Sequence, residues 1–141
     1  MIKNLFSILC QDFIEEKDTR LITYIKQIES VASAKLPVRI PFVSLCTLWQ
    51  VALAGKKEEI FKVRLSLKSP KGKKEILITT NSKSIKKSSR ERINFKLDGM
   101  PIVSVGVYTF ILEYQNGKEW EIANEVDLII ANADKNVGKD K

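Results

Sequence analysis

The sequence predicts an all-β domain. Apolar residues recur at every second position through most of the chain, which is the period of a half-buried strand. Turn residues interrupt these runs about every eight to twelve residues, and no segment of ~10 residues shows a clear helical pattern. These observations predict an antiparallel β-sandwich or barrel of about eight strands. The expected strands are residues 5–14, 20–31, 39–53, 59–69, 74–80 and 92–99, with two more inside 106–131.

The first two segments are expected to pair as a hairpin. Residues 5–14 are apolar on both sides, as in a buried strand, and the polar turn EEKDT follows at 15–19. Residues 20–31 are rich in Ile, Thr and Tyr, which suit a pleated surface. A loop closed by Pro37 comes next, and Pro41 marks the start or the edge of the third strand because proline cannot donate to a β-ladder.

The middle strands alternate clearly. Within 39–53 one face carries Val43, Leu45, Thr47, Trp49, Val51 and Leu53. Within 59–69 the residues expected to face the core are Phe61, Val63, Leu65 and Leu67, and those expected to face solvent are Lys62, Arg64, Ser66 and Lys68. The sequence SPKGKK (69–74) has the chemistry of a turn. We expect 81–91 to be a polar loop.

The last strands end the predicted fold. Residues 92–99 place Ile93, Phe95 and Leu97 on one side. Asn116-Gly117, between two alternating runs, is the strongest short signal for a hairpin. Trp49 and Trp120 lie inside apolar strands and are expected to pack in or against the core.

Length and composition predict one domain. A chain of 141 residues corresponds to a single domain, which we place at 1–131, and a disordered polar tail is expected at 132–141. No apolar run approaches the ~20 residues needed to cross a bilayer, so no membrane contact is expected. The N-terminal segment lacks the pattern of a signal peptide, which makes the cytoplasm the expected location.

The residue types present offer little to catalysis. The chain has no histidine, which removes Ser–His and Cys–His pairs and histidine-ligated metal sites. Cys10 and Cys46 lie in apolar surroundings and are predicted to be buried free thiols. Glu119 and Glu121 flank Trp120 and are expected to meet neighbouring lysines on the strand surface rather than form a paired-carboxylate site. We therefore predict no enzyme activity, no cofactor and no metal.

Several segments have a familiar combination of motifs: FSILCQDFI, LPVRIPFVSLCTLW, the SPKGK turn, GVYTFIL and NGKE. Together they resemble a family of small bacterial all-β domains of unknown function, and the resemblance covers roughly 4 to 130. The matching positions are Cys10 and Asp12, Leu36 and Pro37, Pro70 and Gly72, and Gly106 and Tyr108. The resemblance implies an immunoglobulin-like sandwich and no particular activity. In such sandwiches a tyrosine at the start of a late strand bonds back to the adjoining corner, so Tyr108 is expected to be structural.

Positive charge is concentrated in residues 69–92. This segment holds eight basic and two acidic residues, a net +6, while the whole chain carries +7. Five cations form the candidate binding set: Lys83, Lys86, Lys87, Arg90 and Arg92. Clustered cations of this kind neutralise phosphates in nucleic-acid-binding proteins. The segment has no Phe, Tyr or Trp, however, and single-strand binders interleave aromatic residues with charge.

Three interpretations of the basic segment therefore stay open: a solvated loop that keeps a sheet edge from pairing, a protein-docking loop, and a nucleic-acid site. We favour a non-catalytic β-sandwich interaction module. It would dock an unknown protein partner through an edge strand or an end loop, or self-associate as a homo-oligomer. Weak electrostatic nucleic-acid binding through 69–92 is the alternative.

Overall fold

The computed structural model describes residues 1–33 and 35–132. Every regular element in these residues is a β-strand, and no helix among them has the length and apolar character needed to cross a bilayer. The strands are β1 (Ile2–Glu15), β2 (Ile22–Gln27), β3 (Ser30–Ser33), β4 (Val38–Ile40), β5 (Val43–Val51), β6 (Glu59–Phe61), β7 (Val63–Lys68), β8 (Lys74–Thr79), β9 (Lys83–Ile85), β10 (Ser89–Leu97), β11 (Met100–Ile102), β12 (Gly106–Asn116) and β13 (Glu119–Asn132).

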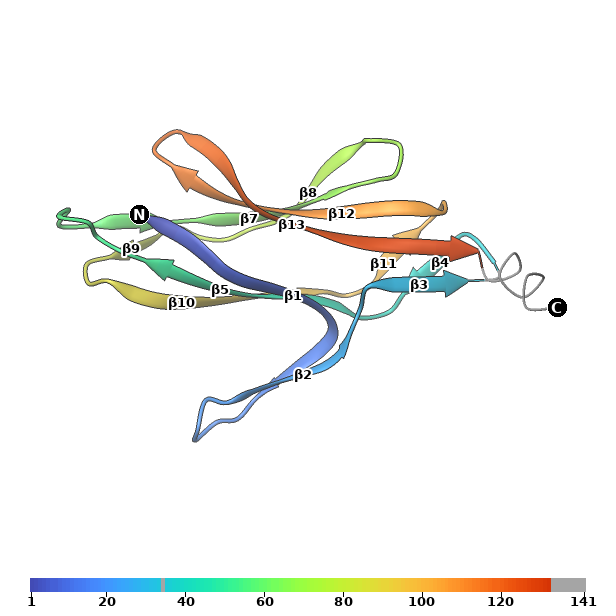
Figure 1. The fold of residues 1–141 in the computed structure, drawn as a ribbon, viewed down its shortest axis with the longest axis horizontal. Coiled ribbons are helices and arrows are strands. Elements are labelled where there is room, and N and C mark those ends of the chain that lie inside the picture. The colour runs from blue at the N-terminus through green and yellow to red at the C-terminus, as the bar shows by residue number, and fades with distance from the viewer. Residues whose placement is uncertain (34, 133–141) are drawn as a thin grey trace.

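Two large sheets form the layers of the sandwich (Figure 1). The first, sheet A, has the order β10-β5-β1-β2, and the second, sheet B, has the order β3-β13-β12-β7-β8. Two short pairs, β11-β4 and β6-β9, complete the described part of the chain. All pairings are antiparallel except β3 with β13. The predicted all-β sandwich is thus confirmed.

The core lies between the two sheets. It is built by the apolar faces of β5 in sheet A and of β12 and β7 in sheet B, as the alternation predicts. Its largest fully buried side chains are Trp49, Phe110, Leu9, Leu45, Leu65, Ile102, Leu112 and Leu128. Thr47 sits among them because its hydroxyl group donates to the Ile93 carbonyl (2.7 Å) and accepts from Trp49 Nε1 (2.8 Å). Both polar groups are therefore satisfied inside the core.

The N-terminal hairpin is confirmed, but its second strand is shorter than predicted. β2 ends at Gln27, next to Lys26, which has a positive φ of 52°. The chain then crosses to sheet B, where β3 pairs in parallel with the end of β13. The prediction of one strand over 20–31 is therefore wrong, because the alternating pattern runs through a change of sheet.

Other predicted strands are interrupted. Residues 39–53 divide into β4 and β5, and residues 59–69 divide into β6 and β7, with Lys62 between them. Ser66, expected to face solvent, is fully buried on the outer face of sheet B. The hairpin at Asn116-Gly117 and the turn at 69–74 are as predicted.

The polar loop predicted at 81–91 is wrong for most of its length. It contains β9, which pairs with β6, and the first residues of β10, which pair with β5. Residues 81–82 and the turn 86–88 are the parts of the predicted loop that lie outside strands. The predicted tail at 132–141 falls outside the described residues, except for Asn132, which ends β13.

Candidate functional site

The five predicted cations divide between two strands and the turn that joins them. Lys83 lies on β9, and its Nζ contacts the Glu91 carboxylate at 3.0 Å. Arg90 and Arg92 lie two residues apart on β10, so they share one face of sheet A. The remaining two, Lys86 and Lys87, are exposed in the turn before β10. The structure therefore places Arg90 and Arg92 on the same face, whereas the side chain of Lys83 is directed to Glu91 and not to the two arginines.

The face that carries the two arginines is the outer face of sheet A. The ladder places Arg90 opposite Gln50 and Arg92 opposite Leu48, while the core residue Trp49 between them points the other way. Lys96, opposite Ser44, continues the same row toward the end of β10. We call Arg90, Arg92 and Lys96 the basic row. Lys96 was not among the predicted site residues, although its spacing from Arg92 by an even number of residues places it on the same face of the strand.

Aromatic side chains reach the basic row from elsewhere in the sequence. Nη1 of Arg92 donates to the Tyr24 hydroxyl oxygen at 3.3 Å. The Tyr24 ring meets the edge of Phe6, with centroids 6.4 Å apart, and Phe6 lies opposite Leu48, the ladder partner of Arg92. Aromatic groups that residues 69–92 do not themselves contain therefore lie beside the basic row at Arg92.

Lys96 is engaged by the N-terminal hairpin as well. Its Nζ lies 4.9 Å from the centroid of the Phe13 ring and 3.5 Å from Asp12 Oδ1. The side chains of this ion pair are both at least half exposed, so the pair adds little to stability. The two contacts link β10 to the far end of β1 within sheet A.

The two thiols lie on the same face, on the neighbouring strands β1 and β5. Cys10 is opposite Ser44, and Cys46 is opposite Ile8, which leaves the two Sγ atoms 3.8 Å apart. Both are free and fully buried, as predicted. Burial raises the pKa of both thiols, and it raises that of Cys46 to about 12. These thiols are therefore protonated at neutral pH.

The outer edge of β10 is open. Within 1–33 and 35–132, β10 has one strand neighbour, β5, and it forms one end of sheet A for nine residues. An edge strand of this length presents a row of backbone N–H and C=O groups to whatever can pair with them. Backbone donors and acceptors on the edge therefore lie beside a row of cations on the face.

The two tryptophans and two glutamates named from the sequence lie apart from the basic row. Trp49 is fully buried, and Trp120 is half-buried under the guanidinium group of Arg64, 4.3 Å from the ring centroid. Glu121 accepts from the Tyr114 hydroxyl (2.6 Å) and from Asn116 Nδ2 (2.9 Å) rather than meeting lysines, which corrects the prediction. Tyr114 can reach Glu121 because the two residues are opposite in the β12–β13 hairpin. Glu119 is exposed next to the turn.

Tyr108 has the predicted structural role. Its hydroxyl group accepts from the Val103 N–H (3.4 Å) and donates to the Ser104 carbonyl oxygen (3.5 Å). Both partners lie in the corner that leads into β12. Tyr108 therefore fixes this corner, as the resemblance to tyrosine-corner sandwiches implies.

A buried ionic cluster on sheet B was not predicted. Glu113 accepts from Nε and Nη2 of Arg64 and from Nζ of Lys74, at 3.1, 3.3 and 3.2 Å. Burial alone would raise the pKa of Glu113, but the hydrogen bonds and charges of Arg64 and Lys74 outweigh burial and lower it. Arg64 and Lys74 neutralise the charge of Glu113 within the cluster, so we assign the cluster a structural role. Among the described residues, no group of three or more acidic or cysteine side chains is placed to hold a metal ion.

Comparisons with known proteins identify the chain by family only. No curated protein matches it. One solved structure, a β-glucosidase from Erythrobacter marinus, is similar over 71% of this chain and 14% of that chain, with 13% identity and a TM-score of 0.41. The chain thus spans only a small part of that enzyme's length. A family of unknown function, DUF6941, matches residues 5–127. This confirms the predicted resemblance to an uncharacterised family, and the chain belongs to DUF6941.

Proposed function

We propose that this protein is a non-catalytic docking module that binds an extended, acidic segment of another protein as an additional strand on β10. The observation that carries the proposal is the open edge of β10 beside Arg90, Arg92 and Lys96, which recur at even spacing along one face. A strand added to an exposed edge gains affinity from main-chain hydrogen bonds and specificity from alternate side chains. β10 offers both unpaired main-chain groups on its edge and cationic side chains at alternate positions on its face.

Charge favours an acidic partner over a second copy of this chain. The protein carries +7, and two β10 strands pairing with one another would bring arginines and lysines of like charge together. Acidic side chains at alternate positions of an added strand would instead lie beside the basic row. The cations Lys86 and Lys87, in the turn before β10, extend the positive surface and would speed association with such a segment.

The non-catalytic part of the proposal rests on the residues near β10. Arginine, lysine and backbone amides bind anions and strands, and the chain contains no histidine to act as a base beside them. The cytoplasmic location remains part of the proposal. It is supported by the two cysteines, which are free and buried with adjacent sulfur atoms, as suits a reducing compartment.

The test uses a synthetic ten-residue peptide in which Glu alternates with Val, and fluorescence anisotropy at low salt. We expect the triple variant Arg90→Gln/Arg92→Gln/Lys96→Gln to weaken binding at least tenfold. The matched control, Lys68→Gln/Lys71→Gln/Lys118→Gln, removes the same charge from exposed positions away from β10 and should weaken binding by less than threefold. N-methylation of alternate peptide amides along one edge should abolish binding to the wild-type protein.

Two results would overturn this proposal. One is the absence of saturable binding by any alternating acidic peptide. The other is equal weakening by the two triple variants, because that would mean that only net charge matters and the β10 edge does not.

Nucleic-acid binding is a second candidate, favoured by the aromatic groups beside Arg92. Single-strand binders combine a cationic track with rings on which bases stack, and Phe6 and Tyr24 are close enough to the basic row to supply such rings. A 15-nucleotide oligo-dT should then bind with a log–log salt slope of about −3, as expected for ~4–5 phosphates on a single strand. Replacing Lys83, Lys86, Lys87, Arg90 and Arg92 with Gln should abolish binding. If that variant binds unchanged, these five cations do not form a nucleic-acid site.

A further inference from the structure

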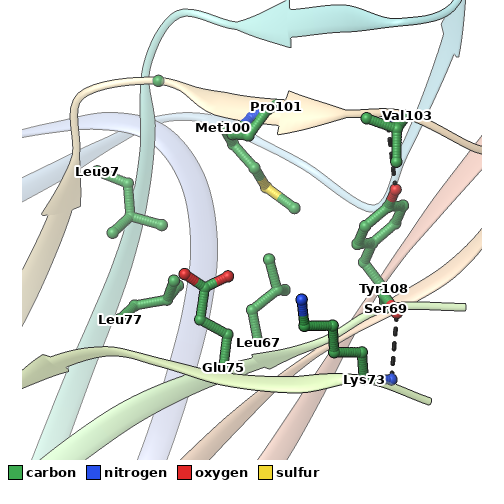
Figure 2. A pocket seen from close by; sticks show the side chains of 11 residues that line it. Leu67, Ser69, Lys73, Glu75, Leu77, Leu97, Met100, Pro101, Val103 and Tyr108 are labelled. Carbon is green, nitrogen blue, oxygen red and sulfur yellow. Dashed lines mark hydrogen bonds between the residues drawn. The ribbon is translucent and has the colours of Figure 1, made fainter. Parts of the chain in front are cut away.

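A cavity of about 310 Å³ opens between the two sheets, next to the β7–β8 hairpin (Figure 2). One wall comes from β7 and β8, and the opposite wall comes from the end of β10 and from β11. Its floor is apolar and includes Leu67, Leu97, Met100 and Tyr108. The volume lies at the lower end of the range for small-molecule sites.

The walls of this cavity are fixed in place. Tyr108 is held by its bonds to the Val103 N–H and the Ser104 carbonyl oxygen. The turn before β8 is closed by the Ser69 N–H donating to the Lys73 carbonyl oxygen at 2.9 Å, and by the Lys73 N–H donating to Ser69 Oγ at 3.3 Å. The cavity is therefore a built feature of the sandwich, situated where the edges of the two sheets separate.

Two opposite charges face this apolar space. Figure 2 shows the side chains of Lys73 and Glu75 both extending from the β7–β8 hairpin into the cavity, toward Met100 and Leu97. Alternation along a strand explains why residues two apart share this direction. Across 1–33 and 35–132, neither the Lys73 ammonium group nor the Glu75 carboxylate makes a hydrogen bond or ion pair. Both residues are exposed at the mouth of the cavity, so water solvates their charges in the free protein, and each charge stays available to pair with a ligand group of opposite charge.

We propose that the cavity binds a small zwitterion with an apolar side chain, of the class of a free apolar α-amino acid. The ligand's carboxylate would pair with Lys73 Nζ, its ammonium group would pair with the Glu75 carboxylate, and its side chain would lie against Leu67 and Met100. A fatty acid satisfies only Lys73 and an alkylamine satisfies only Glu75, so each leaves one charge unpaired. This site is separate from the outer face and edge of β10 and goes beyond the docking function.

Inward-pointing charges on an edge strand have another known role, which is to keep that edge from pairing with other chains. This role requires no ligand and makes a different prediction. Variants that lose the charges would then aggregate, and no small molecule would bind to the wild-type protein. Titrating the wild-type protein with amino acids distinguishes ligand binding from protection of the sheet edge.

The titration follows backbone amide signals by NMR as L-phenylalanine, L-leucine or L-methionine is added. We expect saturable shifts at 75–77 and 97–101 with these ligands and none with glycine. Hydrocinnamate, which lacks the ammonium group, and phenethylamine, which lacks the carboxylate, should each bind at least tenfold more weakly than phenylalanine, because each loses one charge-assisted hydrogen bond. These comparisons use the wild-type protein, so they do not depend on any variant folding.

Variants then assign the two head-group contacts. Lys73→Met should weaken phenylalanine binding about tenfold and leave phenethylamine binding unchanged, while Glu75→Gln should weaken phenylalanine binding and leave hydrocinnamate binding unchanged. Lys71→Met, in the same turn but outside the cavity lining, is the matched control and should bind like the wild type. The proposal is overturned if no amino acid gives saturable shifts, or if hydrocinnamate binds as tightly as phenylalanine. Acidic-peptide binding at β10 is unaffected by either result.

Discussion

Arg64 holds the carboxylate of Glu113 with two hydrogen bonds, 3.1 Å from Nε and 3.3 Å from Nη2, on the face of sheet B that points away from the core. The two residues are directly opposite on β7 and β12, so the ladder itself fixes their approach. Glu113 is only 4% exposed although it lies on an outer face. Paired hydrogen bonds from one guanidinium group are among the strongest polar contacts in proteins.

Glu113→Gln should therefore destabilise the fold. The amide keeps the size of the side chain but leaves the charges of Arg64 and Lys74 without a counter-ion, at a cost of about 1–3 kcal/mol. Urea unfolding followed by tryptophan fluorescence measures the change. Glu119→Gln, at an exposed position on β13, is the control and should change the free energy of unfolding by less than ~0.5 kcal/mol. Equal effects would show that the Arg64–Glu113 pair contributes nothing.

The same carboxylate predicts the response to acid. The pKa of Glu113 in the folded protein lies below its ordinary value of 4.5. Its contribution is therefore complete above pH 4.5 and is lost as pH falls from about 4.5 through the lower, folded value. Unfolding midpoints between pH 7 and pH 3 should fall less steeply for Glu113→Gln than for the wild type. Parallel curves for the two proteins would contradict the assignment.

The two thiols should be unreactive in the native state. Cys10 and Cys46 are fully buried, and burial raises the pKa of Cys46 to about 12, so the thiolate that attacks a disulfide reagent is nearly absent at pH 8. We expect modification by dithiobis(nitrobenzoic acid) to occur at the rate of unfolding and to become fast in urea. Ser82→Cys, which adds an exposed thiol, should react at once with a stoichiometry of one. Fast native reaction of the wild type would contradict the burial of the pair.

Two glycines with positive φ should differ in their tolerance of a side chain. At Gly117, in the β12–β13 turn, φ is 65° and a Cβ would meet nothing within 4 Å, so Gly117→Ala should cost only about 1 kcal/mol of backbone strain. At Gly106, φ is 127° and a Cβ would lie 2.8 Å from Pro70 Cβ. Gly106→Ala should therefore cost clearly more, measured as the loss in urea midpoint. Equal losses would mean that the 69–74 turn can move away from β12.

The pattern of the sequence predicts the strands that lie wholly within one sheet. The alternation of Val43, Leu45 and Trp49 identifies the core face of β5, because a central strand with one face in the core must alternate. The hairpin at Asn116-Gly117 is predicted for a local reason, since a tight turn needs a residue that accepts positive φ. These features depend only on neighbours in the sequence.

The features that were missed depend on partners far away in the chain. Residues 20–31 keep their alternation of apolar and polar residues while the chain passes from sheet A to sheet B. The sequence pattern therefore does not show where β2 ends and β3 begins. The segment 81–91 is rich in Ser and Lys and looks like a loop, but pairing with β6 and β5 makes most of it strand. The candidate site follows the same rule: the even spacing of Arg90 and Arg92 is local, whereas their contact with Tyr24 and Phe6 is not.

The parallel pairing of β3 with β13 has a consequence for the order of folding. β3 begins at Ser30, and its only strand partner in the described chain is the distant end of β13, where Ile129 lies opposite Ser30. Contacts between such distant segments form slowly, because closing a long loop costs chain entropy before the contacts add any stabilisation. The edge of sheet B that β3 forms therefore stays incomplete until β13 has been synthesised. Shortened chains that stop before Glu119 would leave β12 as an unprotected edge.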